Sequence, residues 1–210
     1  MPPFNLKVLP KSQQALWKFF SAHREKLGKG RFYLAGGTAL ALQLGHRESN
    51  DFDFFSEKRS TAENIHEWLS SSPDFILRDW DENTLHGELQ KTKVSFIGGY
   101  KYPLVRNPLK VSGLSLASIV DIGLMKLLAV SHRATLRDYI DLAAILRNQI
   151  PLKKLLALTL KKYGRSFNPL VPLKALVSFE DLDQEMPILL DKKLGRTWQE
   201  ILRGAARETI

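Results

Sequence analysis

The 210-residue sequence contains no cysteine, so disulfide bonds and cysteine-based zinc sites are excluded. It lacks the run of about 18 apolar residues that a membrane-spanning helix needs. The opening MPPFNLKVLP also lacks the basic and then apolar order of a signal peptide. Acids are the minority charge, because 22 Asp and Glu stand against 31 Lys and Arg, a formal net charge of +9. We therefore expect a cytoplasmic protein, and the positive balance favours an anionic partner such as nucleotide or RNA.

Residues 32–56, FYLAGGTALALQLGHRESNDFDFFS, carry the most informative pattern. An apolar run leads into a glycine pair and a short helix, and a polar loop then leads into a strand of alternating acids and aromatics. Because successive strand side chains point to opposite faces, Asp51 and Asp53 should share one face. Phe52 and Phe54 should point the other way, into a core. Two adjacent carboxylates repel each other, and magnesium is the usual ion that relieves this repulsion.

The glycine pair predicts the other half of a phosphate site. Gly36 and Gly37 allow backbone N–H groups to approach an anion, and a helix opening at Thr38 would direct its positive end toward it. Arg47 and Ser49 lie in the loop between this turn and the acids, where they could contact a triphosphate. A DxD or a GG alone is most often a surface turn, but the order strand, GG, helix and acidic strand favours a metal and phosphate site.

A second constellation lies in the helical half of the chain. Lys126 lies inside the apolar helical stretch 116–130, so its ammonium must either extend to solvent or meet an anion. The following pattern is Arg133-x-x-x-Arg137-Asp138-x-x-Asp141. On a helix Arg137 and Asp141 are one turn apart and can pair. An ion-pair network that holds two helices together explains this pattern as well as an active site does.

The order of elements predicts an α+β fold. Three short β-like runs at 75–80, 84–89 and 92–98 are joined by short turns typical of antiparallel hairpins. The stretch 99–114 is punctuated by prolines and a glycine and reads as a linker. We therefore expect a mixed sheet with flanking helices in residues 1–105, followed by an all-helical domain in residues 106–210.

At these residues the sequence resembles a known family. GG-T-A-L, G-H-R-x-S and D-x-D-F-F are similar to the first motif of the AbiEii/AbiGii toxin branch of the nucleotidyltransferase-fold superfamily. Lys126 followed by R-x-x-x-R-D-x-x-D is similar to the later motifs of that family. The resemblance covers about residues 30–147 and implies a nucleotidyltransferase-like fold whose helical domain completes the active-site cleft.

The resemblance also implies an activity and partners. The enzyme would use magnesium to move a nucleoside monophosphate from a nucleoside triphosphate to an acceptor hydroxyl, with RNA, and tRNA in particular, as the expected acceptor. It would be the toxin of a toxin–antitoxin pair with a separately encoded antitoxin. Asp51 and Asp53 would hold the metal, Lys126 would bind phosphate and act in catalysis, and Asp138 would complete the catalytic set. Gly36, Gly37, Thr38, Arg47, Ser49 and Lys126 would bind the nucleotide.

One departure from the family pattern leaves alternatives open. The superfamily normally takes a third carboxylate from a later strand of the sheet, where this sequence has Val94-Ser95-Phe96. A serine hydroxyl cannot replace a carboxylate as a base or a metal bridge. Either another acid serves, or one metal suffices, or the protein is a catalytically degenerate nucleotide- or RNA-binding module. A transferase that modifies a protein hydroxyl is a third hypothesis.

Overall fold

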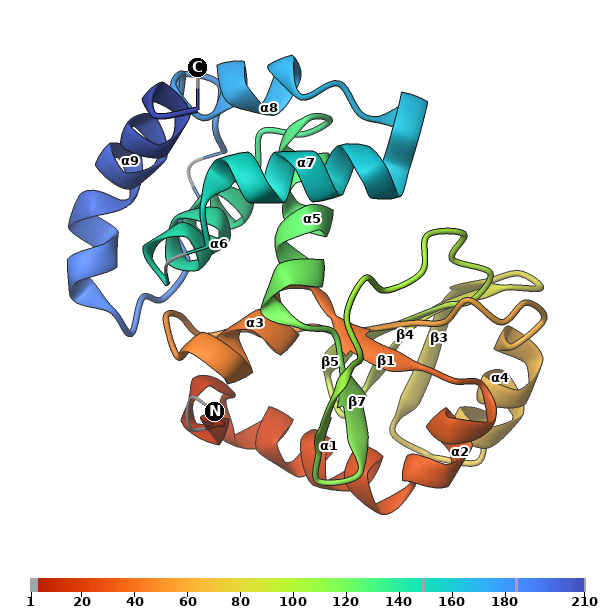
Figure 1. Ribbon diagram of the computed structural model, residues 1–210. Coiled ribbons are helices and arrows are strands. Elements are labelled where there is room, and N and C mark those ends of the chain that lie inside the picture. Colours follow the sequence, from red (N-terminus) through yellow and green to blue (C-terminus); the bar gives the residue numbers. More distant parts are fainter. Residues whose placement is uncertain (1–3, 149, 184, 210) are drawn as a thin grey trace.

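The computed structural model describes residues 4–148, 150–183 and 185–209 and is built around a seven-stranded mixed sheet (Figure 1). The strand order is β3-β4-β5-β2-β1-β7-β6. The strands are β1 (Tyr33–Ala35), β2 (Phe52–Phe55), β3 (Phe75–Trp80), β4 (Thr84–Leu89), β5 (Thr92–Ile97), β6 (Leu109–Val111) and β7 (Leu114–Leu116). β1 and β2 are antiparallel at the centre, and β2 and β5 run parallel. The antiparallel hairpins predicted over 75–97 are confirmed.

The helices of the first half flank this sheet. They are α1 (Lys11–Ala22), α2 (Arg24–Lys29), α3 (Gly36–Leu44) and α4 (Ala62–Ser70). α1 and α4 lie on the side of Phe52 and Phe54. α1 and α2 are separate helices because the chain breaks at His23, which lies outside the helical region of φ and ψ. α3 ends at Gly45 in the left-handed conformation, φ +66°, as expected of a glycine after a helix.

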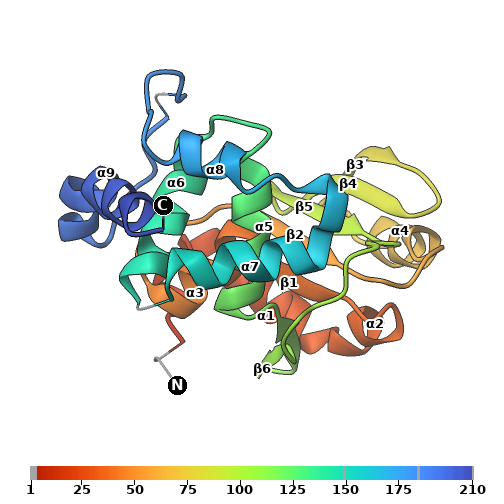
Figure 2. The same cartoon turned by 45° about the horizontal axis from the view of Figure 1, so that its top comes forward.

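The second half is helical. It contains α5 (Ile119–Val130), α6 (Leu136–Arg147), α7 (Leu152–Tyr163), α8 (Leu170–Ala175) and α9 (Lys192–Arg207). α5 packs against α6 and α7, and α6 packs against α9 (Figures 1 and 2). No helix in the described ranges is both long enough and apolar enough to cross a bilayer.

The predicted linker over 99–114 is only partly a linker. β6 and β7 form a hairpin there, and β7 pairs in parallel with β1 through Leu34 and Leu116. These strands have three residues each, too short for periodicity to distinguish them from loop, and that is why the sequence pattern missed them. The sheet therefore continues beyond residue 105, and the division into domains at this residue stays a prediction.

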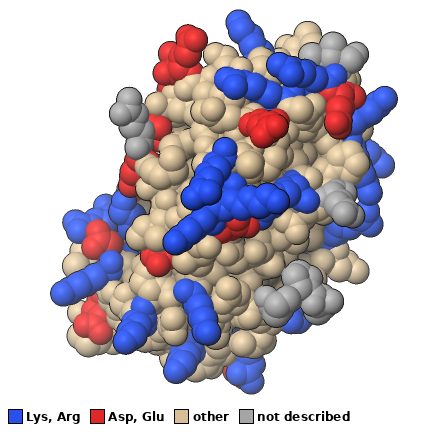
Figure 3. All heavy atoms as spheres, turned by 90° about the vertical axis from the view of Figure 1, so that its left-hand side faces the viewer, with Lys and Arg blue, Asp and Glu red and all other residues tan. Residues whose placement is uncertain are grey.

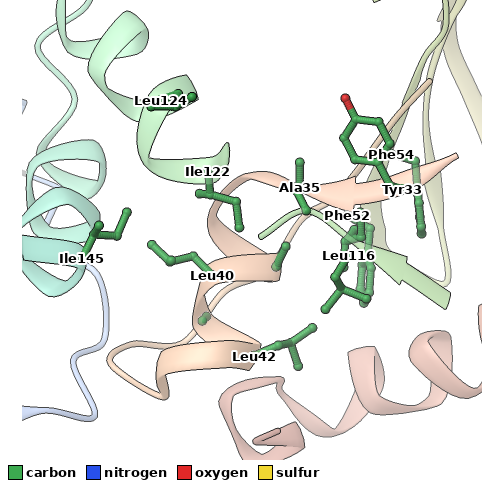
Figure 4. Packing of buried hydrophobic residues seen from close by; sticks show 14 of the residues in the cluster. Tyr33, Ala35, Leu40, Leu42, Phe52, Phe54, Leu116, Ile122, Leu124 and Ile145 are labelled. Atoms are coloured by element: carbon green, nitrogen blue, oxygen red, sulfur yellow. The ribbon is translucent and has the colours of Figure 1, made fainter. Parts of the chain in front are cut away.

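The core joins the sheet to the helical half through α3. Phe20, Phe52, Phe54 and Phe96 pack together on one face of the sheet, with the rings of Phe54 and Phe96 stacked at 5.1 Å. Figure 4 shows Leu40 of α3 on the side of the helix that faces α5 and α6. All of these side chains are buried. α3 packs against β1 and β2 and also against α5 and α6, which places the glycine turn at its start beside the acidic strand.

Candidate active site

The two acids of the D-F-D-F run lie where β2 begins. Asp51 immediately precedes the strand, and Asp53 lies beside Ala35 of β1 in the antiparallel register. Phe52 and Phe54 have exposed fractions of 0% and 1% and enter the core. Both acids line one cavity on the other face. The alternation predicted from the sequence is thus confirmed, and β2 presents two carboxylates to the same space.

The glycine turn is sterically required beside these acids. Gly36 has a φ of +66°, and a Cβ added there would lie 3.0 Å from the carboxylate of Asp53. A Cβ at Gly37 would overlap the guanidinium of Arg47. Because neither glycine has a side chain, the N-terminus of α3 can lie directly against Asp53. The backbone N–H groups of this first helical turn have no partner within the helix, and the helix dipole is positive here.

Two hydroxyls fasten the acidic segment to α3. The Thr38 side chain donates a hydrogen bond to the backbone carbonyl of Asp51, and the Thr38 and Ser49 oxygens are 2.8 Å apart. Because the Thr38 proton goes to the carbonyl, Ser49 is the donor in the second bond. Thr38 has an exposed fraction of 2%. Its hydroxyl therefore positions Asp51, and its contribution to an anion site is its backbone N–H.

Side chains from both halves of the chain meet in one polar cavity of about 300 Å³. It is lined by Gly37, Thr38, Arg47, Ser49, Asp51, Asp53, Lys126, Arg133, Thr135, Arg137, Asp138 and Asp183. Every residue that the sequence assigned to the site lies here except Gly36, which lines an adjoining cavity. The convergence is a geometric finding, and the role of each residue stays a prediction.

Asp53 is held at an electrostatic cost. Burial raises the pKa of its carboxyl and the charge of Asp51 raises it further, and together these effects outweigh the Ser95 hydroxyl and Lys126, which lower it. A cation bound between the acids would remove this cost. In the described part of the chain no group of three or more His, Asp or Glu side chains could hold a metal. Magnesium, however, commonly takes one or two carboxylates and completes its coordination with water and substrate phosphates, so this pair fits it.

Lys126 of α5 reaches the same cavity from the helical half. Its ammonium nitrogen lies 2.6 Å from Asp138 Oδ1 and 2.6 Å from Asp141 Oδ2, both on α6. The Lys126 side chain is only 9% exposed, so it meets anions inside the protein and does not extend to solvent. An ammonium group has three protons to donate. Two serve the α6 acids, and the third is left for a ligand in the cavity.

Asp141 is the centre of a buried ion cluster. It is completely buried, and it accepts hydrogen bonds from His46 Nε2 at 2.8 Å and from Arg47 Nε and Nη2 at 2.7 and 2.9 Å. Burial alone would raise the pKa of Asp141, but the charges of Lys126 and Arg47 and these hydrogen bonds hold it well below its usual range. The cluster ties the loop after α3 to α5 and α6. His46 helps to order this loop through its contact with Asp141.

The predicted pairing of Arg137 with Asp141 is wrong. Asp141 points into the protein, where its two oxygens are taken by the cluster. The Arg137 side chain is 41% exposed, and its closest acid is Glu185, at 3.9 Å. Spacing along the helix correctly put the two residues one turn apart, but their side chains leave the helix toward different surroundings.

Ser95 lies at the position where a third carboxylate was expected. It is the register partner of Asp53 on the parallel strand β5, and also of His86 on β4. The Ser95 oxygen is 3.1 Å from His86 Nδ1. This row across three strands places a hydroxyl and an imidazole beside Asp53 where an acid would otherwise stand.

Four residues of the cavity lining were not assigned to the site from the sequence, namely Arg133, Thr135, Arg137 and Asp183. The Nε of Arg133 bonds Asp138 at 2.7 Å, and its side chain is 61% exposed. Its place in the R-x-x-x-R-D pattern was a usable signal. Asp183 accepts a hydrogen bond from the backbone N–H of Leu136, at the start of α6. Nothing in the sequence around it indicated that it returns to this site.

The surface carries the positive balance of the composition. On the face shown in Figure 3, Lys and Arg side chains predominate, with Asp and Glu between them. Lys162 is an exception among the basic residues of α7, because its side chain is only 2% exposed and lies 3.5 Å from Asp121. Lys162 therefore does not add to the exposed basic surface of α7.

Comparison with known proteins identifies the family of the chain. A family profile described as nucleotidyl transferase AbiEii toxin, type IV TA system, matches residues 20–209. The uncharacterized protein aq_aa25 of Aquifex aeolicus (strain VF5) is 38% identical over 162 residues, which are 74% of this chain and 77% of that protein. JHP933 from Helicobacter pylori, known from a crystal structure, aligns with 96% of this chain and 94% of its own at 20% identity, with a TM-score of 0.48. The profile covers most of the chain, which therefore belongs to the AbiEii family of nucleotidyltransferase toxins of type IV toxin–antitoxin systems.

Proposed function

We propose that the protein transfers a nucleoside monophosphate from a nucleoside triphosphate to an acceptor hydroxyl at the polar cavity. The observation that carries this proposal is the convergence of Asp51 and Asp53 with Lys126 and the glycine turn in that one cavity. Acids of the sheet half and a cation of the helical half face the same space. This is the arrangement that a polyphosphate and its metal ion need.

Asp51, just before β2, and Asp53 within it would hold magnesium. When bound, magnesium would supply positive charge that neutralises the phosphates, including the charge that develops as pyrophosphate leaves. The raised pKa of Asp53, caused first by burial, supports this role because the carboxylate is not neutralised by a partner of its own. Thr38 keeps Asp51 in place through its hydrogen bond to the Asp51 carbonyl.

The glycine turn and the basic side chains would hold the phosphates. Gly36, Gly37 and Thr38 offer backbone N–H groups at the start of α3, and Ser49 stands beside them. Lys126 would neutralise phosphate charge with its remaining proton. Most of the Arg47 guanidinium is committed to Asp141 and to the carbonyl of Glu48. Its contribution to nucleotide binding is therefore mainly its positive charge.

Asp138 is our proposed acceptor of the proton from the attacking hydroxyl. It lines the cavity, which supports the assignment. It is also engaged by Lys126 and Arg133 at 2.6 and 2.7 Å. These contacts occupy both carboxylate oxygens, Oδ1 with Lys126 and Oδ2 with Arg133. We expect Asp138 to work only if a bound substrate draws Lys126 toward its phosphates.

We further propose RNA, and tRNA in particular, as the acceptor, and a cognate antitoxin as a partner. The net charge of +9 supports an acceptor with a phosphate backbone. We also propose that the reaction takes place in the cytoplasm, where nucleoside triphosphates are available. The cleft would lie between a domain of residues 1–105 and a domain of residues 106–210, since the cavity takes its lining from both.

A second candidate is a nucleotide- or RNA-binding protein that has lost catalysis. Ser95 favours this candidate, because it is the register partner of Asp53 where a carboxylate was expected. The third candidate, transfer to a protein hydroxyl, needs the same site and differs only in the acceptor.

One experiment separates these functions. The protein is incubated with each of the four α-³²P-labelled nucleoside triphosphates, with magnesium and with either total RNA or total protein. We expect label in RNA. Label in protein would support the third candidate, and retained nucleotide binding without any transfer would support the second. An Asp51→Asn, Asp53→Asn double variant is the matched control, since it removes two charges from the cavity and leaves its shape nearly unchanged.

A further inference from the structure

The row formed by Asp53, Ser95 and His86 crosses three strands beside the polar cavity. β2, β5 and β4 lie side by side in the sheet (Figure 2). Ser95 is the register partner of Asp53 on one side and of His86 on the other, so the three side chains share one face. Within the described ranges, neither Ser95 nor His86 lines the polar cavity. A ligand in this cavity would meet Asp53, and the other two side chains could act on it only through Asp53.

The direction of the hydrogen bonds along this row follows from the number of protons available. An ionised carboxylate only accepts hydrogen bonds, so the bond between Ser95 and Asp53 uses the hydroxyl proton of Ser95. A hydroxyl has one proton, so the Ser95 oxygen accepts in its contact with His86 Nδ1, 3.1 Å away. His86 therefore carries a proton on Nδ1. The imidazole donates to the hydroxyl, and the hydroxyl donates to the carboxylate.

We infer that Ser95, held by His86, is a positioning residue that orients the Asp53 carboxylate for a metal ion. This inference rests on the proposed function, in which Asp53 is a metal ligand. Carboxylates that hold a metal are commonly fixed by a hydrogen bond from an outer group, which sets their orientation. Here the protein would offer magnesium two carboxylates, so the orientation of each one matters for its affinity.

Asp53 is confined on both sides of β2. On the side of β1, a Cβ added at Gly36 would lie 3.0 Å from Asp53 Oδ2, so the start of α3 packs against this carboxylate. On the side of β5, Ser95 reaches it with a hydrogen bond. β4 and β5 are paired without interruption from Thr84 and Ile97 to the turn, which fixes the backbone of His86 and Ser95. The donor is therefore in place before any ion binds.

A serine at this position acts differently from the acid that was expected there. A third acid would add another negative charge beside Asp51 and Asp53. Ser95 instead supplies a neutral donor, which lowers the pKa of Asp53 even though burial keeps it raised overall. It thereby favours the ionised form of Asp53, which is the form that binds a metal. The serine then belongs to a metal site and is not by itself a sign of lost catalysis.

The test measures binding of Mn²⁺, which replaces magnesium because electron paramagnetic resonance detects the free ion. Nucleotide is omitted, so that the protein alone holds the metal. Ser95→Ala removes the donor and should weaken Mn²⁺ binding about tenfold or more, as is usual when the outer partner of a metal ligand is lost. Ser95→Thr is the matched control, because it keeps the hydroxyl, and its affinity should stay within about twofold of the wild type.

Two variants of His86 test the second bond of the row. The amide nitrogen of Asn is the same number of bonds from Cα as Nδ1 of His, so His86→Asn can still donate to Ser95 and should keep the wild-type affinity. His86→Phe cannot donate and should weaken Mn²⁺ binding severalfold. Thr84→Ala, on the same face of β4, is the control for a general disturbance of the sheet and should leave the affinity unchanged.

Melting temperatures of all variants separate positioning from a purely structural role, which would lower stability and leave Mn²⁺ affinity unchanged. The inference is overturned if Ser95→Ala binds Mn²⁺ as tightly as the wild type while the Asp51→Asn, Asp53→Asn double variant does not. If Ser95→Ala does not fold, wild-type affinity in His86→Phe overturns it in the same way. If the double variant binds Mn²⁺ as well as the wild type does, the metal assignment of the proposed function fails, and the inference fails with it.

Discussion

Asp53 and Asp141 are both acids removed from most solvent, yet their surroundings differ sharply. Asp141 is fully buried and accepts hydrogen bonds from His46 and Arg47, with Lys126 at 2.6 Å. Its pKa lies well below the usual range. Asp53 has a raised pKa because burial and the charge of Asp51 outweigh its favourable contacts. Asp141 is neutralised within the protein, whereas we propose that a bound cation neutralises Asp53.

This difference distinguishes structure from function in a single charged region. The Asp141 cluster links a loop of the sheet half to two helices, so its ions serve the fold. The carboxylates of Asp51 and Asp53 repel each other, and a metal ion bound with its nucleotide would relieve this repulsion. Replacement of each Asp by Asn removes the charge and nearly keeps the shape of the side chain, so it tests whether the two acids have these different roles.

The largest effect is expected from Asp53→Asn or Asp51→Asn. Each should lower the rate of nucleotide transfer about 10³-fold, because a metal held by one carboxylate loses several kcal/mol of charge stabilisation. The melting temperature of Asp53→Asn at pH 7 should stay equal to the wild type or rise, since the substitution removes an unfavourable buried charge. Transfer assays and thermal melts of the same preparations test both statements. A variant with full activity would contradict the assignment of the metal ligands.

Asp141→Asn should act in the opposite way. Removal of one partner from a buried ion cluster leaves Arg47 and Lys126 without their anion and typically costs about 3–5 kcal/mol of unfolding free energy. Urea denaturation measures this cost. Asp79→Asn, on the exposed strand β3, is the control and should change the free energy by less than about 0.5 kcal/mol. A loss at Asp141 as small as the control would mean that the cluster is not needed for the fold.

Asp141 and Asp53 should also make the stability of the protein depend on pH in opposite ways. The folded-state pKa of Asp141 is depressed, so its stabilisation is present above the unfolded-state pKa, near 3.8, and is lost as the pH falls through the lower folded-state value. The folded-state pKa of Asp53 is raised, so stability should fall as the pH rises from about 3.8 through that value. Denaturation of the wild type and the two Asn variants between pH 3 and 7 tests this. Asp53→Asn should lose the fall in stability with rising pH, and Asp141→Asn should lose the fall in stability at low pH.

The smallest effect is expected from Arg133→Ala. The Arg133 side chain is 61% exposed although it bonds Asp138 at 2.7 Å, and exposed ion pairs contribute about 0.2–1 kcal/mol. The same urea experiment should therefore show a loss below about 1 kcal/mol. Lys126→Met, which removes the buried partner of the same acid, should cost more. Equal losses of unfolding free energy in Arg133→Ala and Lys126→Met would mean that the exposed and the buried partner of Asp138 contribute equally to stability.

The sequence was sufficient for the parts of the site that depend on local rules. Strand alternation placed Asp51 and Asp53 on one face, and the glycine pair marked the turn whose φ of +66° at Gly36 favours glycine. Lys126 stood out as a cation in an apolar helix. The three-residue strands β6 and β7 carried no such signal, and they extended the sheet into the stretch expected to be a linker.

Contacts between distant segments were the part that the sequence could not supply. The spacing of Arg137 and Asp141 suggested a pair, but the tertiary fold gives Asp141 three other partners. They are His46 and Arg47, which are 95 and 94 residues away in the sequence, and Lys126 on α5. Asp183 lines the cavity because the chain returns to the start of α6. Periodicity describes which face a residue occupies, and it does not describe which segment will pack on that face.

A crystal structure with magnesium and a non-hydrolysable nucleoside triphosphate would show directly whether Asp51, Asp53 and Lys126 bind one metal–nucleotide complex. We predict a metal ion about 2.0–2.1 Å from oxygens of both Asp51 and Asp53. The Lys126 ammonium should lie within hydrogen-bonding distance of a phosphate oxygen. A nucleotide bound elsewhere, or a metal that touches neither acid, would contradict the account.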